Sequence, residues 1–372
     1  GFLPISHSIP ESAALVIDSP DGRVIHTGDF KLDETPIVGE PFDPELWASV
    51  AKKGVKALVC DSTNVFSRHE GRSETTVGPE IEKLVASAPQ MVVATTFASN
   101  VARVKTLADA GAAAGRSICL LGRAMRRMIE ASIKTGVLSD FPTVVAPEDA
   151  RNIPRENLML IVTGSQGERR AASAQLSRGK HMGLTLKEGD TFLFSSKTIP
   201  GNEAGVAKLA NQLSERGVKV IEESSPDLTG RIHVSGHARK GDLKVLYDAM
   251  RPSMAVPMHG EHRHLVEHAR FAESMQVPSI AAPNGTVVDI SGPKPVIVDE
   301  VETGRIYLDG DTLVGAMDGV VRARLKLARQ GHVVLALVVD EEGELLADPE
   351  IRVVGGPEES GDWPAPLEAM IY

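Results

Sequence analysis

Short apolar runs rich in β-branched residues alternate with longer amphipathic stretches along the first 290 residues of the chain. In residues 78–88 and 202–217 the apolar positions recur with the period of a helix, and Gly217 is placed to end the second helix. Alternation of strand-length runs with helices is typical of α/β proteins with a largely parallel sheet. We therefore predict an α/β fold with strands within residues 13–18, 55–61, 91–97, 117–122, 143–147, 158–164, 191–196, 218–224 and 254–260.

A different pattern begins after Pro293, where the strand-and-helix alternation gives way to glycine-rich connections. In residues 332–351 two alternating apolar runs flank an acidic turn that ends at Gly343. Alternating runs on either side of a short Asp- and Gly-containing turn predict a β-hairpin. We place a domain boundary near residue 310.

The composition is that of a globular protein with room for two or three domains. The chain has 372 residues, of which 42% are hydrophobic, so well-buried cores can form. Its formal net charge of −10 argues against nonspecific coating of nucleic acid, because phosphate neutralisation needs clustered Lys and Arg. Two local basic clusters fit either a solvated face or an RNA contact: Arg123, Arg126 and Arg127 with Lys134, and Arg169 with Arg170.

Nothing along the chain indicates a membrane span or an export signal. No run of about eighteen apolar residues is present, and residues 1–12 lack the basic start and the apolar stretch of a signal peptide. Cys60 and Cys119 are too few for a disulfide framework and do not form a C-x-x-C pair. We expect a cytoplasmic protein without membrane association.

Three residues near predicted strand ends are candidate metal ligands. His7 lies in a turn after a strand, Asp29 ends another strand, and His259 follows the strand at residues 254–258. A carboxylate such as Asp29 can bridge two divalent ions, which lower the pKa of a shared water and hold a phosphoryl oxygen. Taken singly, each residue is more often an ordinary turn or cap residue.

The histidines after this strand allow a second interpretation. His264, Glu267 and His268 have the H-x-x-E-H spacing of inverted zinc peptidases. Nothing else in the chain supports a peptidase, and we favour an exposed helix face that carries these polar side chains.

Two further segments have residues that are suited to binding a phosphate group. Residues 158–168 run from a buried strand into a Gly-, Ser- and Thr-rich turn before a helix, so backbone N–H groups can converge on an anion. This turn is not a Walker loop, because no Gly-Lys-Ser/Thr follows. In residues 231–243, His233, Ser235 and His237 alternate along the chain, and in extended backbone they would face one pocket.

Nine segments together resemble the ribonuclease J family of metallo-β-lactamase/β-CASP RNA-processing nucleases. In chain order they are HSIPES, HTGDFK, CDSTN, EGRSE, TTFASN, TGSQGE, IPGNE, HVSGHA and HGEHRHL. The resemblance implies a metallo-β-lactamase αββα sandwich, whose N-terminal part is missing, with an inserted α/β β-CASP domain and the start of a small C-terminal α/β domain. The implied ranges are 1–70 and 241–310 for the lactamase domain, 71–240 for the β-CASP domain, and 311–372 for a linker and partial C-terminal domain.

The resemblance also implies roles for individual residues. Metal ligands fall on His7, His259 and Asp29, which would be the bridging carboxylate. Asp29, His237 and Asp61 would be catalytic, although Asp61 fits a turn-capping role equally well. The RNA phosphate would be bound by His233, Val234, Ser235, Gly236 and His237, together with Gly164, Ser165, Gln166, Gly167 and Glu168.

The family signature H-x-H-x-D-H, which supplies the remaining metal ligands, does not occur in residues 1–372. Three ligands cannot complete two catalytic zinc sites, which usually need about three protein ligands each. We therefore expect a fragment, cut at both ends, that binds metal weakly and hydrolyses little RNA alone.

For the whole protein the resemblance implies two divalent ions, zinc or else manganese, and RNA hydrolysis in maturation and decay, from the 5′ end, internally or both. It also implies a homodimer or a higher homo-oligomer. The first alternative is a non-catalytic RNA-binding or assembly subunit of the same fold. The second is a hydrolase of small phosphorylated or ester substrates, against which the large inserted domain counts, because it suits a polymer held between two domains.

Overall fold

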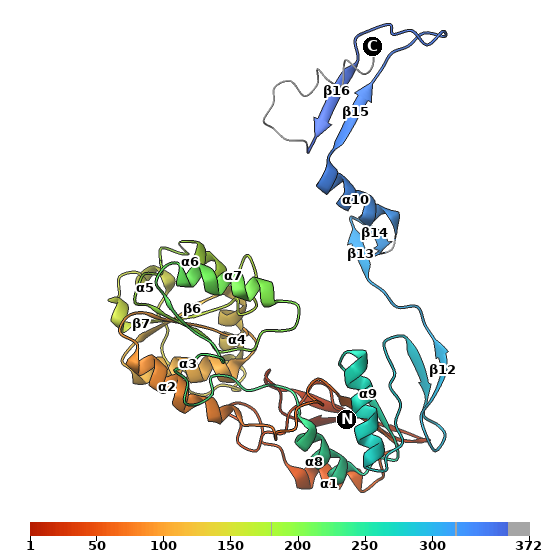
Figure 1. Ribbon diagram of the computed structural model, residues 1–372. Coiled ribbons are helices and arrows are strands. Elements are labelled where there is room, and N and C mark those ends of the chain that lie inside the picture. Colours follow the sequence, from red (N-terminus) through yellow and green to blue (C-terminus); the bar gives the residue numbers. More distant parts are fainter. Residues whose placement is uncertain (180, 317, 356–372) are drawn as a thin grey trace. The chain divides into compact units, whose positions relative to one another are not determined.

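The computed structural model describes residues 1–179, 181–316 and 318–355. The chain divides into two compact units, Gly1–Asp299 and Glu300–Tyr372. The first unit contains two five-stranded sheets, each with its own helices (Figure 1).

The first sheet has the strand order β1-β2-β3-β4-β10. Strand β2 is antiparallel to β1 and β3, whereas β3, β4 and β10 are mutually parallel. Its bounds are β1 (Phe2–Pro4), β2 (Ala13–Ser19), β3 (Gly22–His26), β4 (Ala57–Asp61) and β10 (Ala255–Met258).

One face of this sheet is covered by three helices, α1 (Pro44–Ala51), α8 (Lys240–Met250) and α9 (His262–Ser274). Trp47 of α1 and Tyr247 of α8 are fully buried in the core that these helices form with Leu58 of β4. On the other face, Leu15 and Ile17 of β2 are exposed. The residues described here therefore provide one sheet and one helical layer of the expected sandwich.

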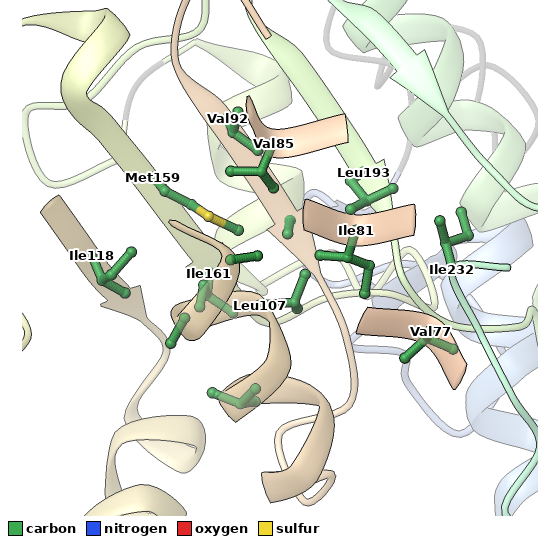
Figure 2. Packing of buried hydrophobic residues seen from close by; sticks show 14 of the residues in the cluster. Val77, Ile81, Val85, Val92, Leu107, Ile118, Met159, Ile161, Leu193 and Ile232 are labelled. Atoms are coloured by element: carbon green, nitrogen blue, oxygen red, sulfur yellow. The ribbon is translucent and has the colours of Figure 1, made fainter. Parts of the chain in front are cut away.

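The second sheet is entirely parallel and has the order β6-β7-β5-β8-β9. Alternate side chains of each strand enter two different cores: Val92 packs with α2, α3 and α4 (Figure 2), and Val93 packs on the opposite face with α5, α6 and α7. The strands are β5 (Val92–Thr95), β6 (Ser117–Leu121), β7 (Leu158–Val162), β8 (Thr191–Phe194) and β9 (Lys219–Ile221). The helices are α2 (Gly78–Ser87), α3 (Val101–Ala113), α4 (Arg123–Lys134), α5 (Pro147–Ala150), α6 (Ala172–Arg178) and α7 (Glu203–Ser214), with short 3₁₀ turns at Glu74–Val77 and Arg155–Asn157.

The second sheet is inserted between two neighbouring strands of the first. Strand β4 pairs with β10, with Leu58 opposite Ala255, although the whole second sheet lies between them in sequence. The returning chain is attached to the first sheet where the Ala238 N–H donates to the Phe30 carbonyl, at 2.5 Å. The predicted α/β fold, with its parallel sheet and inserted domain, is confirmed.

One predicted strand is wrong. Residues 143–147 form no strand; Val144 makes a single bridge to Ile118, and the Val145 N–H donates to the Ile118 carbonyl. Pro142 and Pro147 flank this run, and proline has no N–H to offer a neighbouring strand. The apolar run is therefore attached at the edge of β6 without extending the sheet.

The segment after α9 is built of hairpins. Strands β11 (Thr286–Asp289) and β12 (Val296–Glu300) form a two-stranded sheet. In the second unit β13 (Ile306–Asp309) pairs with β14 (Thr312–Gly315), and after α10 (Gly319–Gln330) β15 (His332–Ala336) pairs with β16 (Glu350–Val354). Between β15 and β16 the chain turns at residues 340–343, where the Gly343 N–H donates to the Asp340 carbonyl, so the predicted hairpin is confirmed. No helix within the described ranges is both long and apolar enough to cross a membrane.

Candidate functional site

The candidate site lies where four strands of the first sheet end. Strands β1 and β3 run in the same direction, because each is antiparallel to β2, and β4 and β10 are parallel to β3. The segments that leave these four strands therefore meet at one edge of the sheet. His7, Asp29, Asp61 and His259 each follow or end one of the four strands.

Two carboxylates and two imidazoles form a compact cluster at this edge. Asp29, Asp61, His237 and His259 each offer a ligand atom, and these atoms lie within 4.8 Å of one another. His259 Nδ1 lies 3.3 Å from Asp29 Oδ1 and 3.4 Å from Asp61 Oδ1. The structure thus brings together two of the predicted metal ligands, Asp29 and His259, with Asp61 and His237, which were expected to be catalytic.

Asp61 is the buried centre of this cluster. Its Oδ2 lies 2.7 Å from His237 Nδ1, and its Oδ1 accepts hydrogen bonds from the N–H and the hydroxyl of Thr63, at 2.8 and 2.6 Å. Burial by itself would raise the pKa of Asp61, but the hydrogen bonds from His237, His259 and Thr63 outweigh it and hold the pKa well below its usual range. Asp61 is therefore an anion that both closes its turn and orients two histidines.

His259 occupies a strained backbone conformation. Its φ is +54°, in the left-handed region that non-glycine residues rarely adopt. Its Nδ1 lies 2.8 Å from the Thr63 hydroxyl, and the hydrogen bond to Asp61, more than any other interaction, raises the pKa of the ring. The sharp exit from β10 thereby turns the imidazole towards both carboxylates.

His7 lies beside the cluster. Its Nδ1 lies 2.6 Å from the Gly236 carbonyl, and its ring centroid lies 4.9 Å from that of His237. Because a carbonyl can only accept, Nδ1 carries the hydrogen and Nε2 keeps its lone pair, the arrangement found for histidines that bind metals. Burial, as the largest effect, lowers the pKa of His7 and favours this neutral form. A Cβ at Gly236 would lie 2.9 Å from His7 Cε1, so only glycine allows this approach.

Residues 233–237 connect the cluster to the inserted domain. Ile232 and Val234 are buried in the core of the second sheet, with the half-buried His233 between them and the half-buried Ser235 and His237 after them. That these three polar side chains face one pocket stays a prediction. The Ser235 hydroxyl accepts from the side-chain amide of Asn64 at 2.8 Å. The same amide donates to the His237 carbonyl at 3.0 Å. The first domain therefore holds this segment directly.

Positive charge surrounds His233. Burial first, and then four neighbouring cations, lower its pKa to about 3, so the ring is neutral at pH 7. The contributing cations are Arg103, Lys197, Lys31 and Arg239. Arg103 and Lys31 are already paired with the carboxylates of Glu74 and Asp33, whereas Lys197 and Arg239 form no ion pair within the described ranges. A neutral imidazole beside these two cations is a suitable environment for a phosphate group.

The loop at residues 163–168 is tied to its own surroundings. The Gln166 side chain donates to the Lys197 carbonyl at 3.1 Å and accepts from the Ile199 N–H at 2.8 Å. The Gln166 N–H is bound by the Glu168 carboxylate at 2.9 Å. Gln166 and Glu168 thus already have partners within the protein, and the expected phosphate role of this loop stays a prediction.

The peptidase alternative is wrong. His268 is fully buried; its Nδ1 lies 2.9 Å from the Ser62 hydroxyl and its Nε2 3.0 Å from the Tyr247 hydroxyl. His264 Nδ1 accepts a hydrogen bond from the Glu261 N–H at the start of α9. The two histidines therefore serve the core and a helix cap and do not share a metal.

A buried ion pair next to the site was not predicted. Arg103 of α3 is completely buried, and its guanidinium contacts the Glu74 carboxylate at 2.5 and 3.0 Å. The same guanidinium donates to the carbonyls of Ser195 and Ile232, at 2.8 and 3.0 Å. The only signal in the sequence is a charged residue among the apolar positions of α3, which is also common on exposed helix faces.

Comparisons with known proteins agree with these observations. Residues 89–213 match the family described as "Ribonuclease J, beta-CASP domain", and residues 230–282 match the "Zn-dependent metallo-hydrolase RNA specificity domain". A solved structure of a protein of unknown function from Enterococcus faecalis V583 matches with a TM-score of 0.52 at 15% identity, covering 80% of this chain and 63% of that one. This likeness concerns the fold alone.

Curated relatives match over nearly the whole chain. Ribonuclease J of Sinorhizobium meliloti is 38% identical over 370 residues, covering 99% of this chain and 64% of the relative. Ribonuclease J of Corynebacterium glutamicum is 37% identical over 367 residues, covering 96% of this chain and 50% of the relative. The chain thus spans between half and two thirds of the length of these relatives. From the matched domains, these relatives and the cluster at the sheet edge, we conclude that the chain belongs to the ribonuclease J family.

Proposed function

We propose that this chain contributes the catalytic centre of a ribonuclease that hydrolyses RNA phosphodiester bonds from the 5′ end, internally or both. The observation that carries the proposal is the cluster of Asp29, Asp61, His237 and His259, which adjoins the phosphate-suited residues 233–237. The relatives named ribonuclease J support the same reaction.

The donor set fits divalent metal ions. Two carboxylates and imidazole nitrogens are the ligands that zinc and manganese accept in hydrolytic sites. Asp61 is anionic, and His7 has its Nε2 lone pair beside the cluster, 3.3 Å from the Ser8 hydroxyl. His7, Asp29 and His259 would hold two such ions, preferably zinc. When bound, such ions supply a hydroxide at neutral pH and stabilise charge on phosphoryl oxygens.

The protein residues prepare the site for this chemistry. Anionic Asp61 accepts the hydrogen of His237 Nδ1 and so fixes the orientation of the ring. His237 Nε2 is then available either to contact the phosphate or to protonate the leaving oxygen. His259 contacts Asp29, and its ring stacks on that of His237 with centroids 5.3 Å apart.

RNA recognition should depend on phosphates and sugars more than on base identity. His233 and the cations around it provide charge for the backbone. Only 4% of the residues are aromatic, so we expect little base stacking, with Phe97 available for one nucleotide. Low sequence specificity is the expected consequence.

The setting of the whole protein follows from the same family. The free, buried Cys60 and Cys119 support a cytoplasmic location, where thiols stay reduced. The resemblance to ribonuclease J supports a homodimer or a higher homo-oligomer for the full-length protein.

The test combines metal content with cleavage of a 5′-monophosphorylated RNA, measured on this chain and on any longer natural form that includes an H-x-H-x-D-H segment. His259→Ala should abolish cleavage and lower metal content. His262→Ala removes an exposed imidazole outside the cluster and should change neither. If RNA is bound but never cut at saturating zinc or manganese, the nuclease proposal fails and a non-catalytic RNA-binding subunit replaces it.

A further inference from the structure

Two arginine-rich segments follow neighbouring strands of the second sheet. Strands β6 and β7 are parallel and in register from Ser117 opposite Leu158 to Leu121 opposite Val162, so both end at the same edge. After β6 the chain enters α4 at once, whereas after β7 it forms the loop that precedes α6. We call the five arginines of these two segments the arginine surface: Arg123, Arg126, Arg127, Arg169 and Arg170.

The two segments start in direct contact. The Thr163 N–H donates to the Leu121 carbonyl at 3.1 Å, and a Cβ on Gly122 would collide with the Thr163 side chain. The loop after β7 closes on itself, because the Ser173 N–H donates to the Thr163 carbonyl at 3.1 Å and the Ser173 hydroxyl donates to the Gly164 carbonyl at 2.8 Å. Arg169 and Arg170 lie within this closed loop, which begins beside the first turn of α4.

No carboxylate in the described ranges forms an ion pair with the arginine surface. The described ion pairs of arginine involve other residues: Arg23, Arg103, Arg155, Arg231 and Arg324. Nearby acidic residues are Glu130 on α4, Glu148 on α5, which lies near the same Cys119 thiol as Arg126, and Glu168, whose carboxylate binds the Gln166 N–H. Four of the five arginines are exposed, and Arg126 is partly buried. In a chain of net charge −10, this is a local excess of uncompensated positive charge.

The arrangement is electrostatically unfavourable for the free protein. Arg123 stands in the first turn of α4, where the helix dipole is positive, and this turn contains no acidic residue. Arg123 and Arg127 are four residues apart on the helix, a spacing at which like charges repel. The N-cap residue Gly122 provides no side-chain hydrogen bond. An anion bound at this edge would relieve all of these effects at once.

We propose that the arginine surface binds phosphates of a single-stranded RNA outside the catalytic cluster, an inference that rests on the proposed function. Guanidinium groups match phosphate oxygens in a two-pronged geometry, and all five cations are arginine. The loop that carries Arg169 and Arg170 is also linked to one of the cations near His233, because the Gln166 side chain donates to the Lys197 carbonyl. This link to the phosphate-suited segment favours an RNA strand over an acidic protein.

The test measures how RNA binding depends on salt. Every protein carries His259→Ala so that the RNA stays intact, and binding of a 3′-labelled, 5′-monophosphorylated RNA of about 20 nucleotides is followed by fluorescence anisotropy at several salt concentrations. One variant replaces four exposed arginines with glutamine: Arg123, Arg127, Arg169 and Arg170. The matched control replaces four exposed lysines elsewhere with glutamine: Lys52, Lys53, Lys208 and Lys294.

Each phosphate contact on a single strand contributes about 0.7 to the slope of log K against log salt. The arginine variant should therefore have a slope lower in magnitude by about 2 to 3, whereas the lysine control keeps the original slope. An unchanged slope in the arginine variant, or an equal loss in the control, overturns the proposal. Polyglutamate is added as a competitor at the same concentration of negative charge as the RNA. If it displaces the RNA from the protein with its arginines but not from the arginine variant, the choice of RNA is overturned in favour of an acidic protein.

The two proposals can fail separately. If the proteins without His259→Ala cut no RNA while the arginine variant still shows the lower slope, the nuclease proposal fails and the arginine surface stands. If they cut RNA but the slopes are equal, only the arginine surface fails.

Discussion

Replacing Arg103 with methionine removes the guanidinium that joins three segments of the inserted domain. The change leaves the Glu74 carboxylate buried without its two hydrogen bonds and removes the donors to the carbonyls of Ser195 and Ile232. Breaking a buried ion pair from one side costs about 3–5 kcal/mol, because the remaining charge stays desolvated. We therefore expect Arg103→Met to lower the free energy of unfolding of the inserted domain by at least about 3 kcal/mol.

The double variant Arg103→Met/Glu74→Met separates charge from packing. Removing both charges leaves no buried ion, so the double variant should be more stable than Arg103→Met alone by about 1–3 kcal/mol. It should not fully recover, because the carbonyls of Ser195 and Ile232 still lack a donor.

These differences are measured by urea unfolding of the two single variants, Arg103→Met and Glu74→Met, and of the double variant. Hydrogen exchange of the β8 amides reports on the inserted domain itself. Lys244→Met is the matched control, because it breaks an exposed ion pair with Asp248 and should cost less than about 0.5 kcal/mol. A cost of Arg103→Met no larger than that of the control would refute the argument. The argument would also be refuted if the double variant were destabilised by as much as Arg103→Met and Glu74→Met added together.

Three further predictions concern the site and its support. Gly236→Ala should lower the metal content measured by equilibrium dialysis. The added Cβ would lie 2.8 Å from Ser8 Cβ and 2.9 Å from His7 Cε1 and would displace the imidazole. Unchanged metal content would contradict this prediction. Burial lowers the pKa of His268 from 6.5 to about 4. As the pH falls between these two values, the unfolded chain binds a proton at this residue while the folded protein does not, so unfolding becomes more favourable. Stability should drop by about 3 kcal/mol between pH 7 and about pH 4, and urea unfolding of His268→Gln should show a flatter pH dependence. Asp61→Asn keeps the size of the side chain but removes the anion that orients two histidines, so RNA cleavage should fall by about 10–100-fold; a variant as active as the original would exclude this role.

The alternation of apolar runs predicted most of the fold because the central strands of the second sheet, β5, β7 and β8, are buried on both faces. Strand β7 is buried at every position, and such a strand appears in the sequence as a continuous apolar run. The run at residues 143–147 has the same composition, but its flanking prolines cannot donate hydrogen bonds to a neighbour. Composition alone does not reveal how many hydrogen bonds a run can make.

The candidate site was predictable only in part. Asp29 and His259 were found because they follow strands, and parallel strands bring such positions to one edge. Arg103 and Glu74 were missed because their partners, such as Ile232, are far away in sequence and no local pattern predicts the pairing. The central place of Asp61 depends on contacts with His237 and His259 that only the folded chain makes.

The insertion of the second sheet between β4 and β10 sets the order in which the site can form during synthesis. Asp61 and His259 are 198 residues apart, so a ribosome adding about 5–20 residues per second makes them roughly 10–40 s apart. During that interval the inserted domain, with its local strand connections, can fold first and bring the ends of its own sequence together. The nascent chain therefore completes the cluster that would hold the metal only after the domain that would position the RNA is already in place.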